Sequence, residues 1–236
     1  MSEFKYVGSE LELFAAVHNW KAYWSSRIRP FVTGDVLEVG AGIGANSPYL
    51  DRGGHRRWVC LEPDPLLAAR LNANLSQQAG HRRHEIVCGT TRSLDPSWKF
   101  DSVLYIDVLE HIENDREDLE TAAALLRTGG RIVVLSPAHR RLFTPFDAAI
   151  GHFRRYNRSM LREISPASLR LEKMWYLDSV GLLLSAANLL FLRQSMPTKA
   201  QLAFWDNCVI PVSRALDRGL RYSIGKSIIA IWQKPR

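Results

Sequence analysis

Cysteine is scarce in this sequence, and its pattern gives no indication of a metal site. The three cysteines among 236 residues share no metal-ligand spacing, so we predict no bound metal. Cys60 and Cys88 stand in apolar segments, where we expect both to be buried as small hydrophobic side chains. A sparse, odd count is typical of a reducing compartment. Because the N-terminus also lacks a signal-peptide pattern, we expect a cytoplasmic protein.

The sequence also lacks a hydrophobic run long enough to cross a membrane. The longest run, residues 180–192, contains Ser185 and Asn188 and falls short of the ~20 residues of a spanning helix. The formal net charge is +7, but the basic residues are scattered in short pairs without interleaved aromatic residues. This pattern argues against a nucleic-acid partner. We expect one soluble domain, residues 1–236, with no transmembrane segment and with peripheral membrane contact left open.

A glycine-rich turn is the most informative stretch that is present. Residues 36–46 read V-L-E-V-G-A-G-I-G-A-N, a short apolar run followed by three glycines at alternate positions. Glycine lets the backbone turn sharply and lets a ligand lie against it without interference from a Cβ atom. A buried strand, such a turn and a helix start form the nucleotide-binding corner of a doubly wound α/β sheet.

Two further segments lie at the carboxyl ends of predicted strands, as the glycine turn does. Glu62 ends the next apolar strand, and an acidic residue at that place can accept hydrogen bonds from both ribose hydroxyls. Residues 100–112 read F-D-S-V-L-Y-I-D-V-L-E-H-I, a fourth strand and the turn after it. The carboxyl ends of parallel strands form the ligand crevice, so Asp107 and the turn to His111 should face it.

These motifs resemble those of class I S-adenosylmethionine-dependent methyltransferases, whose first motif is E/D-x-G-x-G-x-G. The resemblance covers about residues 30–140 and implies a methyltransferase that binds S-adenosyl-L-methionine and releases S-adenosyl-L-homocysteine. Thr90 stands where the family commonly has an aspartate near the adenine amino group, so that contact would fall to a hydroxyl or the backbone. The cofactor-binding residues that the resemblance implies are Glu38, Gly40, Ala41, Gly42, Gly44, Asn46, Glu62, Pro63, Gly89, Thr90, Asp107 and Val108.

Strand-like and helix-like segments alternate along the chain, which predicts an α/β fold. We expect a Rossmann-like, seven-stranded, mostly parallel sheet with helices on both faces and a helical insertion between strands six and seven. One expected helix, residues 114–127, has Arg127 in its last turn and Gly129 and Gly130 at its end. The expected parts are an N-terminal helical cap (1–30), a cofactor-binding core (30–140), an acceptor-site loop (141–167) and the insertion (179–220).

The acceptor-site loop carries a dense group of polar residues among aromatic ones. Residues 142–156 read L-F-T-P-F-D-A-A-I-G-H-F-R-R-Y, and the proline and glycine favour a loop over a long helix. The G-H-x-R-R-Y pattern resembles one in a subset of bacterial small-molecule methyltransferases, which implies a position near the acceptor but no particular chemistry. The candidate catalytic residues are His111, Asp147, His152, Arg155 and Tyr156.

We expect either histidine to take a proton from the acceptor, Asp147 to orient the ring and an arginine to hold an anionic group. The alternatives are a structural role for His111 and an arginine–aspartate clamp that fastens the loop to the sheet.

The insertion, residues 179–220, is the segment that we expect to cover the acceptor or to form a dimer interface. Residues 179–194 predict a helix that is apolar nearly all round except for Gly181, Ser185 and Asn188, and such a helix must be buried. We favour a lid or a dimer interface over a membrane-surface patch, with the chain a monomer or homodimer. A second helix, residues 199–218, should kink at Pro211.

The acceptor would be a small, partly apolar molecule, methylated on oxygen, nitrogen or carbon, and natural-product biosynthesis is suggested by analogy alone. The alternatives are a membrane lipid or quinone intermediate as the acceptor, and a non-catalytic protein that only binds the cofactor.

Overall fold

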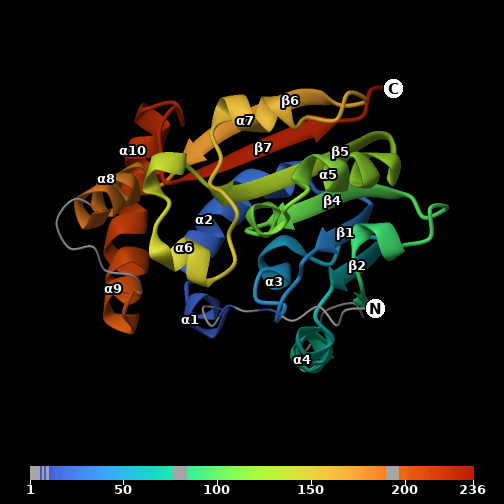
Figure 1. The fold of residues 1–236 in the computed structure, drawn as a ribbon, viewed down its shortest axis with the longest axis horizontal. Helices are drawn as coiled ribbons and strands as arrows, with labels where there is room; N and C mark the ends of the chain where they lie inside the picture. The colour runs from blue at the N-terminus through green and yellow to red at the C-terminus, as the bar shows by residue number, and fades with distance from the viewer. Residues whose placement is uncertain (1–5, 7, 9–10, 77–83, 190–196) are drawn as a thin grey trace.

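A seven-stranded sheet of order β3-β2-β1-β4-β5-β7-β6 runs through the molecule. The computed structural model describes residues 6, 8, 11–76, 84–189 and 197–236. The first five strands are parallel, and β7 runs antiparallel to both of its neighbours. Figure 1 shows most of this order from β2 at the bottom to β6 at the top. The strands are β1 (Asp35–Val39), β2 (Arg57–Glu62), β3 (Glu85–Cys88), β4 (Phe100–Ile106), β5 (Leu126–Pro137), β6 (Arg170–Leu177) and β7 (Ser227–Gln233).

Helices cover both faces of the sheet, as predicted. Successive residues of a strand point to opposite faces: Val103 belongs to one hydrophobic cluster and Leu104 to the other. The cluster with Leu104 includes α2 and the insertion, and the cluster with Val103 includes α5 and α7. The helices are α1 (Leu11–Ala15), α2 (Asn19–Ile28), α3 (Ser47–Leu50), α4 (Pro65–Ser76), α5 (Asp115–Ala124), α6 (Pro145–Ala149), α7 (Arg158–Glu163), α8 (Ser179–Ala187), α9 (Lys199–Phe204) and α10 (Ile210–Gly219).

Short 3-10 turns and π-helical residues also occur among the described residues. The π segment joins α9 to α10 just before Pro211, so the helix changes type where we expected a kink. These segments are η1 (Arg29–Phe31), η2 (Thr91–Ser93), η3 (Leu109–His111), η4 (Arg140–Leu142) and η6 (Trp205–Val209).

The helix predicted at residues 114–127 is shorter than expected. It ends at Ala124, and β5 already begins at Leu126, which pairs with Phe100. Arg127 therefore belongs to a strand, where its guanidinium forms ion pairs with Asp35 and Asp101. The two glycines that were to end the helix lie inside β5 instead. Strand pairing and these ion pairs outweigh the local helical pattern.

The prediction that Cys88 is buried is also wrong, whereas Cys60 is buried as expected. Cys88 ends β3, which is the edge strand of the sheet and has one partner strand only. Cys60 lies in β2, which has a neighbour on each side. Sheet order, which an apolar sequence run does not reveal, explains the difference.

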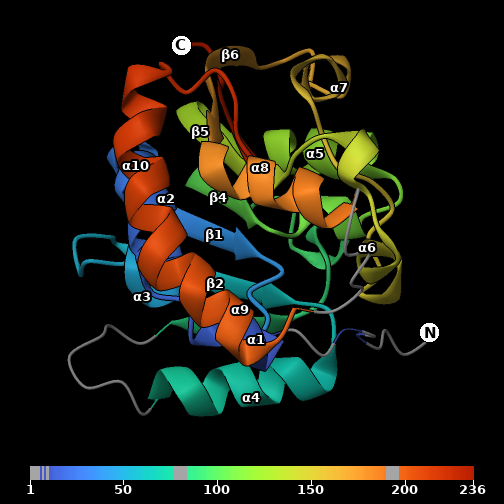
Figure 2. The same ribbon diagram turned by 90° about the vertical axis from the view of Figure 1, so that its left-hand side faces the viewer.

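Helix α8 of the insertion leaves leucine side chains exposed, which contradicts the expectation of a helix buried all round. Leu183 of α8 is 67% exposed and Leu216 of α10 is 49% exposed. The polar groups point inward instead: Ser213 Oγ donates to Asp178 Oδ1 at 2.7 Å, and the Asp178 backbone N–H donates to Asp217 Oδ2 at 2.7 Å. This buried network holds α8 against α10 (Figure 2). Residues 190–194 of the predicted helix lie outside the described residues.

No helix among the described residues combines the length and the apolar character that crossing a membrane requires.

Candidate functional site

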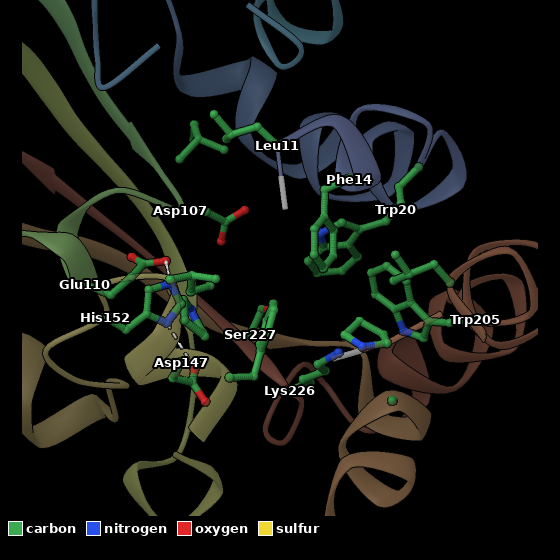
Figure 3. Close-up of a pocket in the computed structure, with 18 of the residues that line it drawn as sticks. Leu11, Phe14, Trp20, Asp107, Glu110, Asp147, His152, Trp205, Lys226 and Ser227 are labelled. Carbon is green, nitrogen blue, oxygen red and sulfur yellow. Dashed lines mark hydrogen bonds and ion pairs between the residues drawn. The ribbon is translucent and has the colours of Figure 1, made fainter. Parts of the chain in front are cut away.

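A cavity of about 740 Å³ opens at the carboxyl ends of β1 and β4. Two different walls enclose it (Figure 3). One wall is polar and carries Asp107, Glu110, Asp147 and His152 from the strand ends and the loop after β5. The opposite wall is largely aromatic, with Phe14 and Trp20 from the N-terminal helices and Trp205 from the insertion. The cavity therefore joins the predicted cofactor site to the predicted acceptor-site loop.

The glycine turn forms the edge of this cavity beside β1. Gly40 has φ +62°, and a Cβ there would lie 2.7 Å from Val108 Cγ1. Gly44 has φ +78°, and a Cβ there would lie 2.7 Å from Leu71 Cδ1 of α4. Both positions combine left-handed backbone with a contact too close for any side chain, so only glycine fits. The third glycine thus lets a helix pack closely, while the first lets the turn after β4 approach.

Glu62 holds the glycine turn in place from the end of β2. Its Oε2 accepts the Gly42 backbone N–H at 2.8 Å, and its Oε1 accepts the Asp64 backbone N–H at 3.0 Å. Burial raises the pKa of Glu62, while the two backbone hydrogen bonds oppose that shift. In this structure both Glu62 oxygens therefore accept backbone hydrogen bonds that fix the turn.

The predicted cofactor residues divide into two groups. Gly40, Ala41, Gly42, Asn46 and Asp107 line the cavity. Glu38 lies behind the turn, where its Oε2 accepts hydrogen bonds from Ser47 Oγ at 2.7 Å and Trp58 Nε1 at 3.0 Å. Thr90 is exposed, and its side chain takes part in a capping box with Ser93. The residues outside the cavity lining are Glu38, Gly44, Glu62, Pro63, Gly89, Thr90 and Val108.

Asp107 follows the last residue of β4 in an unusual backbone conformation. Its φ of +55° is rare for a residue with a side chain, and such outliers cluster at functional sites. The conformation places its carboxylate in the cavity. Desolvation raises the pKa of Asp107 to about 6, against the opposing charges of His152, Lys21 and Lys226.

The turn η3, directly after β4, presents Glu110 and His111. Glu110 is fully buried, and its Oε2 accepts a hydrogen bond from Ser136 Oγ at 2.9 Å. Burial raises the pKa of Glu110, and the Asp107 carboxylate acts in the same direction. Desolvation and the neighbouring His152 lower the pKa of His111 to about 3, so its ring is neutral at physiological pH.

The acceptor-site loop brings Asp147, His152 and Arg155 together. Arg155 binds Asp147 through Nε and Nη2 at 2.8 and 2.9 Å, and His152 Nδ1 lies 3.0 Å from Asp147 Oδ1. Burial alone would raise the pKa of Asp147, but the hydrogen bonds from His152 and Arg155 outweigh it and hold this pKa below its ordinary value. The loop is tied to η3 because the Phe153 backbone N–H donates to the Glu110 carbonyl at 2.8 Å.

Tyr156 lies apart from this group. Its side chain is buried, and its hydroxyl donates to Asp115 Oδ2 at 2.6 Å, at the start of α5. It does not line the cavity. A catalytic role for Tyr156 therefore has no support in the described contacts, whereas the other four candidate catalytic residues all line the cavity.

Several cavity residues were not predicted from the sequence. Lys226 and Ser227 come from the start of β7, and Lys226 Nζ lies 4.8 Å from the centre of the Trp205 ring. Lys21 projects from the otherwise apolar side of α2, where desolvation lowers its pKa to about 8. Glu110 lies inside the segment 100–112, and this motif was the sequence feature that could have indicated Glu110 as a site residue.

This cavity at the carboxyl ends of parallel strands, edged by a glycine turn, defines an α/β protein with a nucleotide-type ligand site. A family model described as a methyltransferase domain matches residues 16–189. The chain therefore belongs to the methyltransferase domain family.

Curated relatives match about half of the chain. The chain is 32% identical over 100 residues to a ubiquinone biosynthesis O-methyltransferase of Bradyrhizobium sp. (strain ORS 278). The matched region covers 42% of the chain and 38% of that protein. The chain is 28% identical over 120 residues to a tRNA U34 carboxymethyltransferase of Shewanella sp. (strain W3-18-1), covering 49% of the chain and 36% of that protein. The matched regions are thus well under half the length of these relatives.

Solved structures share the fold over nearly the whole chain. An S-adenosylmethionine-dependent methyltransferase from Clostridium acetobutylicum ATCC 824 superposes with a TM-score of 0.60 at 10% identity, covering 96% of both chains. The Rossmann-like arrangement predicted from the sequence is confirmed.

Proposed function

We propose that this enzyme transfers the methyl group of S-adenosyl-L-methionine to a hydroxyl oxygen of a small, partly apolar acceptor. The observation that carries the proposal is the pairing of two walls in one cavity: His152 and Glu110 face Phe14, Trp20 and Trp205. The aromatic wall fits an apolar acceptor body, and the polar wall fits the group that reacts. The O-methyltransferase activity in the name of one relative supports oxygen as the methylated atom.

The residues along the glycine turn fit the cofactor. Gly40, Ala41 and Gly42 leave the cavity edge free of bulky side chains, and Asp107 adds a carboxylate beside them. We assign cofactor binding to these residues, with Glu62 fixing the turn through Gly42. S-adenosyl-L-methionine supplies the methyl group in an electrophilic form. The acceptor oxygen forms the new C–O bond as the sulfur–carbon bond breaks, with the bonding pair leaving on sulfur and the hydroxyl proton passing to a base.

The acceptor is positioned by the polar wall. Because Asp147 accepts from His152 Nδ1, the other ring nitrogen is directed toward Glu110 and the cavity. That nitrogen is well placed to hold the acceptor hydroxyl close to the methyl group. Arg155 and Lys226 add positive charge to the same cavity, which suits an anionic substituent on the acceptor.

A membrane-resident quinone or lipid intermediate is a second candidate for the acceptor, supported by the outward apolar face of α8 and α10. Leu183, Leu184, Val212, Leu216 and Leu220 are all exposed there. Arg214 and Arg218 are exposed on α10, on a different side of the helix from Val212 and Leu216. An exposed apolar surface on a helix whose other side carries arginine is typical of contact with an anionic bilayer. Leu184 also lines the cavity, so the face adjoins the site.

Calorimetric titration with S-adenosyl-L-methionine and S-adenosyl-L-homocysteine is the direct test. We expect both to bind with a roughly micromolar dissociation constant, which corresponds to a binding free energy of about −8 kcal/mol. A subsequent screen of phenolic, hydroxylated and amine acceptors should give turnover with hydroxyl compounds. Turnover of amines alone would rule out the assignment to oxygen, and failure of both cofactor forms to bind would exclude the cofactor assignment.

A further inference from the structure

Three side chains of the polar wall converge on one point of the cavity. One ligand atom each from Glu110, His111 and His152 lies within 4.8 Å of the other two. The first two side chains come from η3, and the third comes from the loop after α6. We propose that these three residues bind one divalent transition-metal ion, of the class that includes zinc and cobalt.

The protonation of His152 follows from its partner. Asp147 Oδ1 lies 3.0 Å from His152 Nδ1, and an ionised carboxylate only accepts, so Nδ1 carries the hydrogen. In the neutral ring Nε2 then presents a lone pair, and it lies 3.9 Å from Glu110 Oε1. Nε2 of this tautomer and an ionised Oε1 can each offer an electron pair to the same positive ion.

Glu110 Oε1 is the second, independent observation. Glu110 has no exposed surface, and this oxygen is a buried atom without a hydrogen-bond partner. A buried carboxylate oxygen without a partner is costly. A positive ion placed between Oε1 and the two imidazole rings, whose centres are 4.5 Å apart, would satisfy it.

Supporting contacts orient these side chains, as they do around protein metal ions. Asp147, which accepts from His152 Nδ1, is itself fixed by two hydrogen bonds from Arg155. Glu110 Oε2 accepts from Ser136 Oγ, which leaves Oε1 directed at the rings. A carboxylate behind a histidine ligand fixes its tautomer and its direction.

The donor set indicates which ions fit. Two imidazole nitrogens and one carboxylate oxygen suit zinc, cobalt, iron or manganese, whereas magnesium and calcium prefer oxygen ligands alone. Tetrahedral ligands at about 2.0–2.1 Å from an ion are about 3.3 Å apart, so these side chains would close in by about 1 Å on binding. With the ion bound, His152 Nε2 would hold the acceptor oxygen through the ion instead of directly, and the ion would lower the pKa of the acceptor hydroxyl. That role rests on the proposed function, but the binding of the ion does not.

The test is a titration of the untagged full chain with Co²⁺ after treatment with EDTA and desalting. We expect one equivalent to bind with visible absorption bands, Zn²⁺ to displace it, and millimolar Mg²⁺ to leave the spectrum unchanged. Glu110→Gln and His111→Gln should each weaken Co²⁺ binding by about 100-fold or more, and Asp147→Asn by about 10- to 100-fold. The matched control His18→Gln changes an exposed histidine outside the cavity and should bind Co²⁺ like the wild type.

Absence of stoichiometric Co²⁺ binding to the wild type would overturn the proposal, as would equal binding by wild type and Glu110→Gln. Titration of the same samples with S-adenosyl-L-homocysteine separates the two proposals. Normal S-adenosyl-L-homocysteine binding without Co²⁺ binding rejects the metal site alone. Co²⁺ binding without S-adenosyl-L-homocysteine binding rejects the methyl-transfer proposal alone and leaves the metal site standing.

Discussion

Arg155 forms a bidentate ion pair with Asp147, with Nε 2.8 Å from Oδ1 and Nη2 2.9 Å from Oδ2. Both side chains are buried, and Asp147 also caps α6 by accepting from the Thr144 backbone N–H at 2.8 Å. The loop after β5 is thus held rigid by the same carboxylate that orients His152. Both residues belong to the acceptor-site loop, so this ion pair joins two parts of the loop and does not itself fasten the loop to the sheet. The acceptor-site role of the loop stays a prediction.

Replacing Asp147 by Asn should destabilise the chain, because Arg155 would be left as a buried charge without its partner. Breaking a buried pair from one side typically costs about 3–5 kcal/mol. We expect chemical denaturation to show a loss of that order, and the exposed control Glu163→Gln to change stability by less than about 0.5 kcal/mol. Equal stability of Asp147→Asn and the wild type would show that the clamp is dispensable.

His152→Ala should reduce turnover by about 100-fold or more, since the ring holds the reacting group of the acceptor. Cofactor affinity should change by less than about threefold, because the described contacts of His152 are with Asp147, Glu110 and His111 and not with the glycine turn. Steady-state kinetics and calorimetry on the same preparation provide the two readouts. A parallel loss of turnover and cofactor affinity would assign His152 a structural role.

Glu62→Gln should weaken S-adenosyl-L-homocysteine binding by about 10- to 100-fold. The substitution removes the charge that accepts the Gly42 N–H, and a hydrogen bond to a charged group contributes about 1.5–3 kcal/mol. Glu85→Gln is the control, since Glu85 lies on the exposed edge strand and pairs with Arg57 at the surface. Calorimetric affinities that are equal for Glu62→Gln and the wild type would count against the role of Glu62 in fixing the glycine turn.

Lys21→Met should stabilise the chain at neutral pH. Desolvation of the buried ammonium lowers its folded-state pKa from 10.5 to about 8, so the unfolded chain binds more protons between these values. The cost of burying the charge is therefore fully present below pH 8 and declines as pH rises toward 10.5. At pH 7 we expect Tm to rise by about 2–4 °C for each kcal/mol recovered.

The difference in Tm between Lys21→Met and the wild type should shrink between pH 8 and pH 10. Lys173→Met, at an exposed position of β6, is the control and should show no such trend. A difference that stays constant across this pH range would indicate improved packing rather than removal of a buried charge.

Flotation with anionic vesicles tests the outward apolar face. We expect the wild type to float at low salt and the double variant Leu183→Ser, Leu216→Ser to remain below, because both leucines are exposed and α10 also carries the exposed Arg214 and Arg218. Leu66→Ser is a matched control: Leu66 is 70% exposed, but it lies on α4, away from α8 (Figures 1 and 2). Equal flotation of all three chains, or none by the wild type, would remove the support for a membrane-resident acceptor.

Local patterns predicted much of the core correctly. The strand before the glycine turn and the segment ending in Asp107 are buried on both faces, so their apolar runs could be recognised without knowledge of their neighbours. The errors arose where neighbours decide the outcome. Cys88 is exposed because β3 is the edge strand of the sheet. Arg127 is in a strand, where it forms ion pairs with Asp35 and Asp101.

The candidate site shows the same division. The sequence by itself determined the glycine turn, the acidic end of β2 and the polar loop, because each depends on residues that are adjacent in the chain. Only the tertiary structure brought Glu110 beside His152, placed Lys226 across from them and turned the leucines of α8 outward. Those arrangements depend on strand order and on the buried Asp178 network, which join residues far apart in the sequence. A local sequence pattern cannot predict these contacts between distant residues, because the free energy that stabilises them comes from interactions that exist only in the folded chain.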